Sequence, residues 1–379
     1  MAKARLTSVD ALRGFVMIIM AIDHTRDYFT AARFQPDDLT KTTAAYFLTR
    51  LITHICAPTF MFTAGIGAFL WMRRGRTTVE LSRFLWTRGL WLVILELTVL
   101  RFEMFFRFEG PVLLTVLWAL GWSMIFLGFL VRIPIRPLAV ISIIAIALHN
   151  LADPIQASQF AGGAWIWNIL HQQGVFVVKG VPVVTAYPLF PWMFVMALGY
   201  CFGPVITLDA PLRRKWTFRL GAGLTLAFLA IRAVNVYGDP FRWSTKIPGM
   251  TVLSFFRCTK YPPSLDFLLM TLGPALLLLA LFDGREWSAT NPLIVFGRVP
   301  MFYFLVHFFV IHLLLIPFTL VTNGNAGPIF NAPPFPAGYG YSLGVVYAVW
   351  IAVVVMVYPL CLWFSRLKQR RTDWWLGYL

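Results

Sequence analysis

The sequence predicts an all-α integral membrane protein: a polytopic bundle of about ten transmembrane helices with both termini in the cytoplasm. Three observations support this: the composition, the apolar runs and the placement of basic residues. Hydrophobic residues make up 59% of the 379 residues and charged residues only 13%. A soluble domain of this size uses roughly 25% charged residues to cover its surface, so the composition favours the lipid bilayer as solvent.

Ten apolar runs of about 18 or more residues are long enough to cross a hydrocarbon core. They cover residues 11–29, 46–71, 84–100, 112–131, 135–150, 189–207, 216–236, 265–283, 292–318 and 344–365. The whole chain, residues 1–379, is therefore expected to form a single transmembrane domain. The connections 151–188 and 238–264 lie outside and are long enough to serve as lids over a site.

The basic residues orient this bundle. With the N-terminus inside, 20 of the 32 lysines and arginines fall on the cytoplasmic side, beginning with Lys3 and Arg5. Lys and Arg collect in cytoplasmic loops, so the pattern favours N-in and C-in with an even number of spans. The net charge of +16 is then topological. We expect a multi-pass protein of the plasma (cell inner) membrane whose partners are lipids and not nucleic acid.

The four cysteines are scattered and mostly lie in apolar runs, where they are expected to pack as small apolar residues. No CxxC motif and no Cys/His ligand spacing is present, so the sequence predicts no metal site. The oligomeric state stays open, and a homodimer is one option.

The first helix carries a polar stripe. At 100° per residue, Asp10, Arg13, His24 and Asp27 fall on one face. Each has an ordinary structural explanation: Asp10 could complete a capping box with Thr7, Arg13 could extend to the interface, and His24 could pair with Asp27 at the helix end. Ionisable groups inside membranes are costly and are usually functional, which is the alternative interpretation.

The second apolar run contains a histidine next to a helix break. Pro58 has no N–H, so the carbonyl of His54, four residues earlier, loses its helical partner. His54 is either a structural histidine bonded across helices or part of a site in the outer half.

Further ionisable side chains are predicted at the same depth. His307 lies in the ninth apolar run and is deeper than His312. Other polar residues of the outer half are Glu96, Arg101, Glu103, Arg232, Asn235 and Asp266. Together they predict a polar cavity that opens outward. Histidine suits general-base catalysis there because its pKa is near neutral, and Asp27 would fix the tautomer of His24.

Several motifs resemble the transmembrane acyltransferase superfamily and, within it, the family of the heparan-alpha-glucosaminide N-acetyltransferase catalytic domain in its bacterial branch. They are Ser8-Val9-Asp10-Ala11-Leu12-Arg13-Gly14 followed by Asp23-His24, Thr53-His54-Ile55-Cys56-Ala57-Pro58, Tyr187-Pro188-Leu189-Phe190-Pro191-Trp192, Lys260-Tyr261-Pro262-Pro263-Ser264-Leu265, and Asn291-Pro292-Leu293 with Phe296-Gly297-Arg298. The resemblance implies transfer of an acyl group, typically acetyl, from cytoplasmic acetyl-CoA or another acyl-CoA to a glycan or small-molecule acceptor outside.

The related acyltransferase-3 enzymes have a catalytic histidine fourteen residues after the motif aspartate, which here is His24. The heparan-type pattern instead implies a histidine between the first two helices, and residues 25–53 contain none. An acyl-histidine intermediate therefore does not simply carry over, and direct transfer with His24 as general base is the simpler hypothesis. The sequence leaves both mechanisms open. The catalytic residues expected are His24, Asp27 and His54. Donor or cavity binding is expected of Asp10, Arg13, Asp23, His307, Lys260 and Tyr261.

Two other classes of function fit the same helices. A transporter or flippase for a small anionic or acylated solute would use the same polar cavity. A structural or assembly protein would need no chemistry, and the Asp23-His24 pair together with His54 and Pro58 disfavours it. Solute flux without CoA turnover would indicate the transporter.

Overall fold

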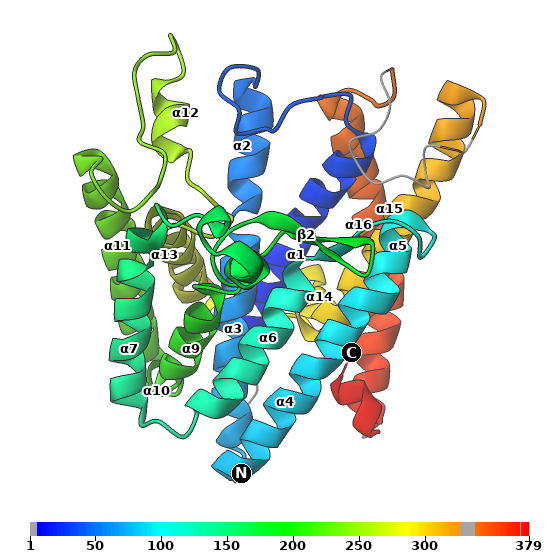
Figure 1. Ribbon diagram of the computed structural model, residues 1–379. Helices are drawn as coiled ribbons and strands as arrows, with labels where there is room; N and C mark the ends of the chain where they lie inside the picture. The colour runs from blue at the N-terminus through cyan, green and yellow to red at the C-terminus, as the bar shows by residue number, and fades with distance from the viewer. Residues whose placement is uncertain (1–5, 326, 328–337, 372, 379) are drawn as a thin grey trace. The chain divides into compact units, whose positions relative to one another are not determined.

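The computed structural model is mostly helical and describes all residues except 1–5, 326, 328–337, 372 and 379 (Figure 1). Lys3 and Arg5 of the predicted basic bias therefore lie outside the described residues. By internal contacts the chain divides into two compact units. The first unit comprises Met1–Cys56, Val99–Phe108 and Phe282–Leu379, and the second comprises Ala57–Thr98 and Glu109–Leu281.

The first unit is built around its N-terminal helix. Its elements are α1 (Thr7–Phe29), α2 (Ala44–Thr53), α5 (Arg101–Phe105), α14 (Pro292–Arg298), α15 (Pro300–Asn323), α16 (Leu343–Arg370) and η6 (Trp374–Gly377). Helix α1 packs against α2, α14, α15 and α16. This explains why much of α1 is buried even though it carries five charged side chains.

Helices α1 and α14 touch backbone to backbone. A Cβ atom placed on Gly297 would lie 1.8 Å from the carbonyl oxygen of Asp10, and one on Gly14 would lie 1.8 Å from that of Leu293. Only glycine permits this approach. The N-cap of α1 is Leu6 and makes no side-chain cap hydrogen bond, so the predicted capping box of Thr7 and Asp10 does not form. The buried Asp10 instead lies against α14.

The predicted break at Pro58 is present. Helix α2 ends at Thr53, His54 is its C-cap, and α3 (Cys56–Met72) begins two residues later, which places Pro58 in the first turn. Proline is tolerated there because the first-turn N–H groups have no partner within the helix. The apolar range 292–318 is also interrupted, between α14 and α15 at Val299.

The second unit holds the remaining helices and a small sheet. Its helices are α3, α4 (Thr78–Leu95), α6 (Val116–Leu130), α7 (Ile135–Leu148), α8 (Ala164–Leu170), α9 (Trp192–Cys201), α10 (Gly203–Ile206), α11 (Ala210–Val234), α12 (Thr251–Phe256) and α13 (Leu265–Phe282), with short η2 (His149–Ala152), η3 (Ala157–Gln159) and η4 (Ala161–Gly163). A π-helical turn, η1 (Glu96–Leu100), continues from α4 to α5 of the first unit.

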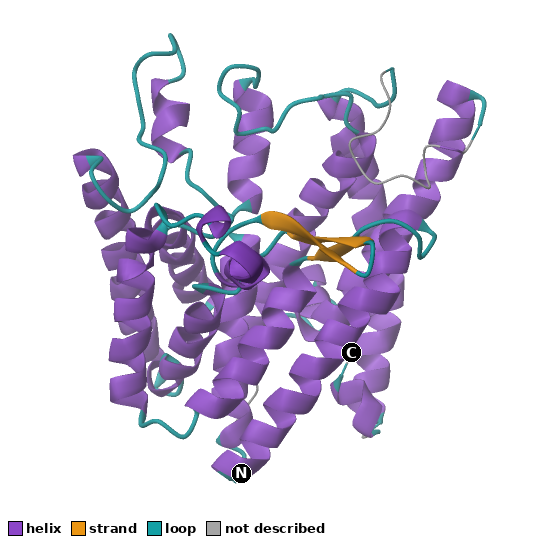
Figure 2. Cartoon of the chain, viewed as in Figure 1, coloured by secondary structure: helices purple, strands orange, loops and turns teal. Residues whose placement is uncertain are grey.

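The sheet is a departure from the all-α prediction. Strands β2 (Gly174–Val178) and β3 (Val181–Thr185) form an antiparallel hairpin, and β1 (Val112–Leu114) pairs with β3 in parallel (Figure 2). Lys179 and Gly180 both have positive φ at the hairpin turn. The run of β-branched residues around Lys179-Gly180 is a hairpin signal in the sequence. Because β1 precedes α6, the apolar range 112–131 is not helical from its start.

In the part of the chain that the structure describes, six helical stretches are long and apolar enough to cross a membrane: Ala44–Met72, Ile135–Ala152, Ala210–Val234, Leu265–Phe282, Pro300–Thr322 and Leu343–Arg370. They include the run 135–150, the shortest that the sequence predicted. Val116–Leu130 and Trp192–Cys201 are shorter apolar helices. The chain is thus a multi-pass membrane protein with mostly helical structure.

Candidate active site

Two histidines meet in the first unit. The Nδ1 atom of His24 on α1 lies 2.7 Å from Nε2 of His307 on α15. His307 is fully buried and His24 is half-buried. The two residues are 283 positions apart in the chain. The sequence analysis predicted that His24 and His307 lie at a similar depth in the bundle. In the structure their side chains are in direct contact.

A backbone carbonyl fixes the tautomers of this pair. Nδ1 of His307 lies 2.9 Å from the carbonyl oxygen of Tyr303, one helical turn earlier. A carbonyl can only accept, so Nδ1 of His307 carries the proton and, with the ring neutral, its Nε2 accepts. His24 must then donate from its own Nδ1, which leaves the lone pair on Nε2 of His24. The arrangement prepares one specific nitrogen of His24 to take a proton.

Aromatic rings enclose both imidazoles. The ring centroid of Phe308 lies 4.1 Å from that of His24, and that of Phe304 lies 6.1 Å away. Tyr303 stacks on His307 at 5.0 Å. Sequence reasoning missed Tyr303, although its position four residues before His307 on one helix was the available signal. The hydroxyl of Tyr303 is buried and has no hydrogen-bond partner among the described residues.

Buried charges flank His24 on α1. Asp23 accepts from Arg50 of α2 and pairs with Arg26, whose Nη1 lies 2.8 Å from Asp23 Oδ1. Arg26 also contacts Asp27, with 2.9 Å from Nη2 to Oδ1. The Asp27 carboxylate therefore binds Arg26, and the His24 ring contacts His307. Arg26 and Arg50 are further residues that the sequence prediction did not include.

His54 lies buried at the break between α2 and α3. Its backbone N–H donates to the carbonyls of Arg50 and Leu51, and the nearby Cys56 thiol donates to the carbonyl of Val16 on α1 at 3.3 Å. The helix break is thus attached to the middle of α1. His312, by contrast, lies 2.6 Å through Nδ1 from the carbonyl of Glu103 at the end of α5, which is a structural helix-end contact.

The remaining predicted residues lie elsewhere. Asp10 and Arg13 are near the start of α1, and Asp10 is about 21 Å from His24 along the axis at ~1.5 Å per residue. Lys260 and Tyr261 belong to the second unit. Glu96, also in the second unit, accepts from the backbone N–H groups of Thr115 and Trp118 and thereby caps the start of α6. Among the described residues no group of three or more His, Cys, Asp or Glu side chains could hold a metal ion.

Comparison with known protein families gives one match over most of the chain. Residues 5–237 match the family described as heparan-alpha-glucosaminide N-acetyltransferase, catalytic. This range includes His24 and His54 and ends before His307. No curated protein sequence matches the chain.

Proposed function

The chain belongs to the family of the heparan-alpha-glucosaminide N-acetyltransferase catalytic domain, and from this we propose that it moves an acyl group, typically acetyl, from cytoplasmic acyl-CoA to a sugar or similar acceptor at the outer side of the membrane. The family supports a membrane transferase. The His24–His307 contact supports a base within it. We propose a bundle of ten transmembrane spans in the plasma (cell inner) membrane, with both termini on its cytoplasmic side.

In the proposed reaction, Nε2 of His24 removes the proton from the acceptor amine or hydroxyl. The acceptor atom attacks the thioester carbonyl, the C–S bond breaks, and the protonated imidazole returns the proton to the leaving CoA thiolate. No external oxidant or reductant is required. His307 holds His24 in the tautomer whose Nε2 can act as the base, a role that needs the buried Tyr303 carbonyl contact.

The other predicted residues receive supporting roles in this proposal. His54 would orient the thioester or the acceptor from the helix break. Asp10 and Arg13 would support the cytoplasmic end of the donor path, where an arginine suits the CoA phosphates. Asp23 and Asp27 would hold the outer end of α1 through Arg26 and Arg50.

The test is CoA release by the purified protein in proteoliposomes, with acetyl-CoA on one side and a panel of amino sugars, glycans and lipid-linked sugars on the other. We expect acceptor-dependent release that is lost in His24→Ala. The matched control is His171→Gln, because His171 is a buried histidine of the second unit that bonds Asp153 at 3.2 Å. Flux of solute without CoA release would instead indicate a transporter.

A further inference from the structure

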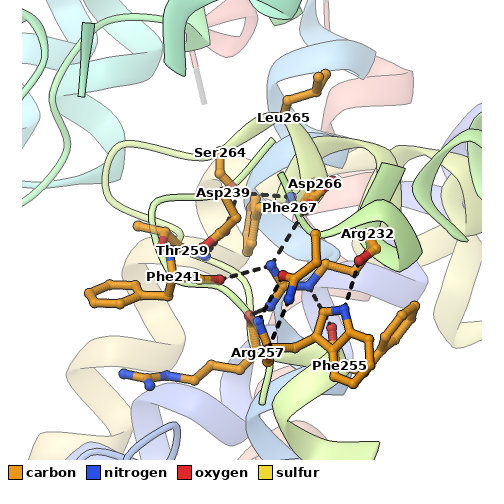
Figure 3. Close-up of polar contacts among 12 residues, drawn as sticks. Arg232, Asp239, Phe241, Phe255, Arg257, Thr259, Ser264, Leu265, Asp266 and Phe267 are labelled. Carbon is orange, nitrogen blue, oxygen red and sulfur yellow. Dashed lines mark hydrogen bonds and ion pairs between the residues drawn. The ribbon is translucent and has the colours of Figure 1, made fainter. Parts of the chain in front are cut away.

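One short segment of the second unit is fastened at both ends by a single carboxylate. Asp239 Oδ2 accepts from the backbone N–H of Thr259 at 2.7 Å and from the hydroxyl of Ser264 at 2.6 Å (Figure 3). Burial raises the pKa of the Asp239 carboxyl, an effect that these hydrogen bonds oppose. Residues 259–264 therefore form a closed loop around Asp239.

A buried arginine fixes the chain that leads into this loop. Arg232, at the end of α11, is 2% exposed and donates to the carbonyls of Phe241, Ser254, Phe255 and Arg257. Its Nη1 also lies 3.5 Å from Asp266 at the start of α13. Figure 3 shows these contacts converging on the one guanidinium. The connection 238–264 is thus an ordered structure, and its polar groups are largely satisfied internally.

The far side of the loop is held as well. His149 Nε2 lies 2.9 Å from the carbonyl of Pro263, and the N–H of Leu265 donates to the side chain of Asn150 at 2.9 Å. A mere connection between α11 and α13 needs no such support. A segment fixed from several sides presents its tip with little freedom, which is what a binding site requires.

The tip presents an ammonium group beside two tyrosines. Lys260 Nζ lies 5.1 Å from the ring centroid of Tyr261 and 5.7 Å from that of Tyr187, which are cation–π distances. The Tyr261 hydroxyl donates to the Tyr187 hydroxyl at 3.3 Å, and the two ring centroids are 4.8 Å apart. Lys260 forms no salt bridge with any carboxylate of the described residues. Among the described residues, this ammonium therefore has two aromatic rings near it and no paired carboxylate.

A buried indole lies near the same tyrosine, Tyr187. Trp192, the first residue of α9, is fully buried and its ring centroid is 5.9 Å from that of Tyr187. Its indole N–H has no acceptor among the described residues. Buried donors are almost always paired with protein or water, so an unpaired one points to a missing acceptor. Within the described residues, the Tyr187 ring thus has near it an ammonium with no paired carboxylate and an indole N–H with no acceptor.

We propose that Lys260, Tyr261, Tyr187 and Trp192 form a binding site for a ligand that carries an oxyanion, either a phosphate or a carboxylate. The ammonium supplies the charge and the indole N–H supplies a hydrogen bond, next to the Tyr187 hydroxyl, which accepts from Tyr261. This use of the site rests on the proposed function, in which the oxyanion belongs either to the acceptor or to the acyl donor. The acceptor and the donor are tested with different probes.

The experiment measures ligand binding to the purified full-length protein without turnover. The probes are inorganic phosphate, glucose 6-phosphate, glucuronate, neutral glucose and CoA. We expect that at least one anionic probe binds, that Lys260→Gln weakens this binding about tenfold or more, and that Lys260→Arg retains it. Lys246→Gln is the matched control, because Lys246 is an exposed lysine of the same connection.

The probes separate the outcomes. Loss of glucose 6-phosphate or glucuronate binding in Lys260→Gln assigns the site to the acceptor, and loss of CoA binding assigns it to the donor. Equal binding of every anionic probe to the parent protein and to Lys260→Gln, or no anion binding at all, overturns the site. Because binding is measured without acyl transfer, this failure is distinct from failure of the catalytic role of His24, which only the transfer assay reports.

Discussion

The two units each contain a buried polar cluster, and the clusters differ in the chemistry of their central side chains. In the second unit, Arg232 gives its donors to four backbone carbonyls and to Asp266. In the first unit, hydrogen bonds run from the Tyr303 carbonyl through the His307 imidazole to the His24 imidazole. The arginine has a fixed charge and fastens the backbone, whereas the histidines can exchange a proton. A cluster that fastens backbone is structural, and one that ends on a titratable atom is a candidate for chemistry.

The largest expected effect is on chemistry in the first unit. His24→Ala should lower acyl transfer about 100- to 10,000-fold, because it removes the general base. The thermal unfolding temperature should stay near that of the parent, because His24 is half-buried and its neighbours are aromatic. CoA release and thermal unfolding, measured side by side, check both parts. A large loss of stability would place His24 with the structural cluster instead.

For Arg232 of the second unit, we expect a large loss of stability. Arg232→Met should destabilise the protein by about 3–5 kcal/mol, because Asp266 loses its buried cation and several carbonyls lose a donor. Denaturant or thermal unfolding in detergent measures this change. Arg242→Met, an exposed arginine of the same connection, is the control and should have little effect. If Arg232→Met were as stable as this control, the contacts of Arg232 would not stabilise the connection 238–264.

A smaller change in stability is expected where α14 packs against α1, the helix that carries His24. Gly297→Ala should cost about 1–3 kcal/mol, because the new methyl group would meet the Asp10 carbonyl at 1.8 Å and push α14 away from α1. Gly223→Ala on α11 is the control, since no neighbouring atom of the described residues lies within 4 Å of its Cβ position and alanine favours a helix. Unfolding free energies of the two variants should therefore change in opposite directions.

The smallest expected change concerns the chemical identity of His307. His307→Gln should keep transfer within about tenfold of the parent, because an amide oxygen can accept the hydrogen bond from His24 Nδ1. His307→Leu offers no acceptor and should lose more activity. Initial rates of CoA release at saturating acetyl-CoA compare the two. Equal losses in both variants would show that the hydrogen bond does not orient His24.

Much of the helical structure could be predicted from local sequence. Each predicted apolar range contains a helix, and the break next to Pro58 follows from its missing N–H. The hairpin at Lys179-Gly180 was missed because short β-branched runs are hard to tell from buried helix by periodicity. The interruption at Val299 was missed because the apolar run continues through it.

Sequence reasoning named His24 and His307 as candidates, but their contact could not be predicted. Sequence depth placed His24 and His307 in the same half of the bundle, yet their contact joins residues 283 positions apart and depends on how α1 packs on α15. Asp27 was expected to fix the tautomer of His24. In the structure Arg26, one residue before Asp27, pairs with the Asp27 carboxylate, and His307 contacts the His24 ring instead. The contacts by which Asp239 and Arg232 fix the connection 238–264 likewise join residues that no local sequence pattern relates.

The central claim is that His24 and His307 act as one catalytic unit. A double-mutant cycle tests it most directly, using CoA release by the parent, His24→Ala, His307→Leu and the double variant. If His307 works only by orienting His24, the double variant should be no slower than His24→Ala. Losses that multiply in the double variant would mean that the two histidines act independently, and would contradict the account.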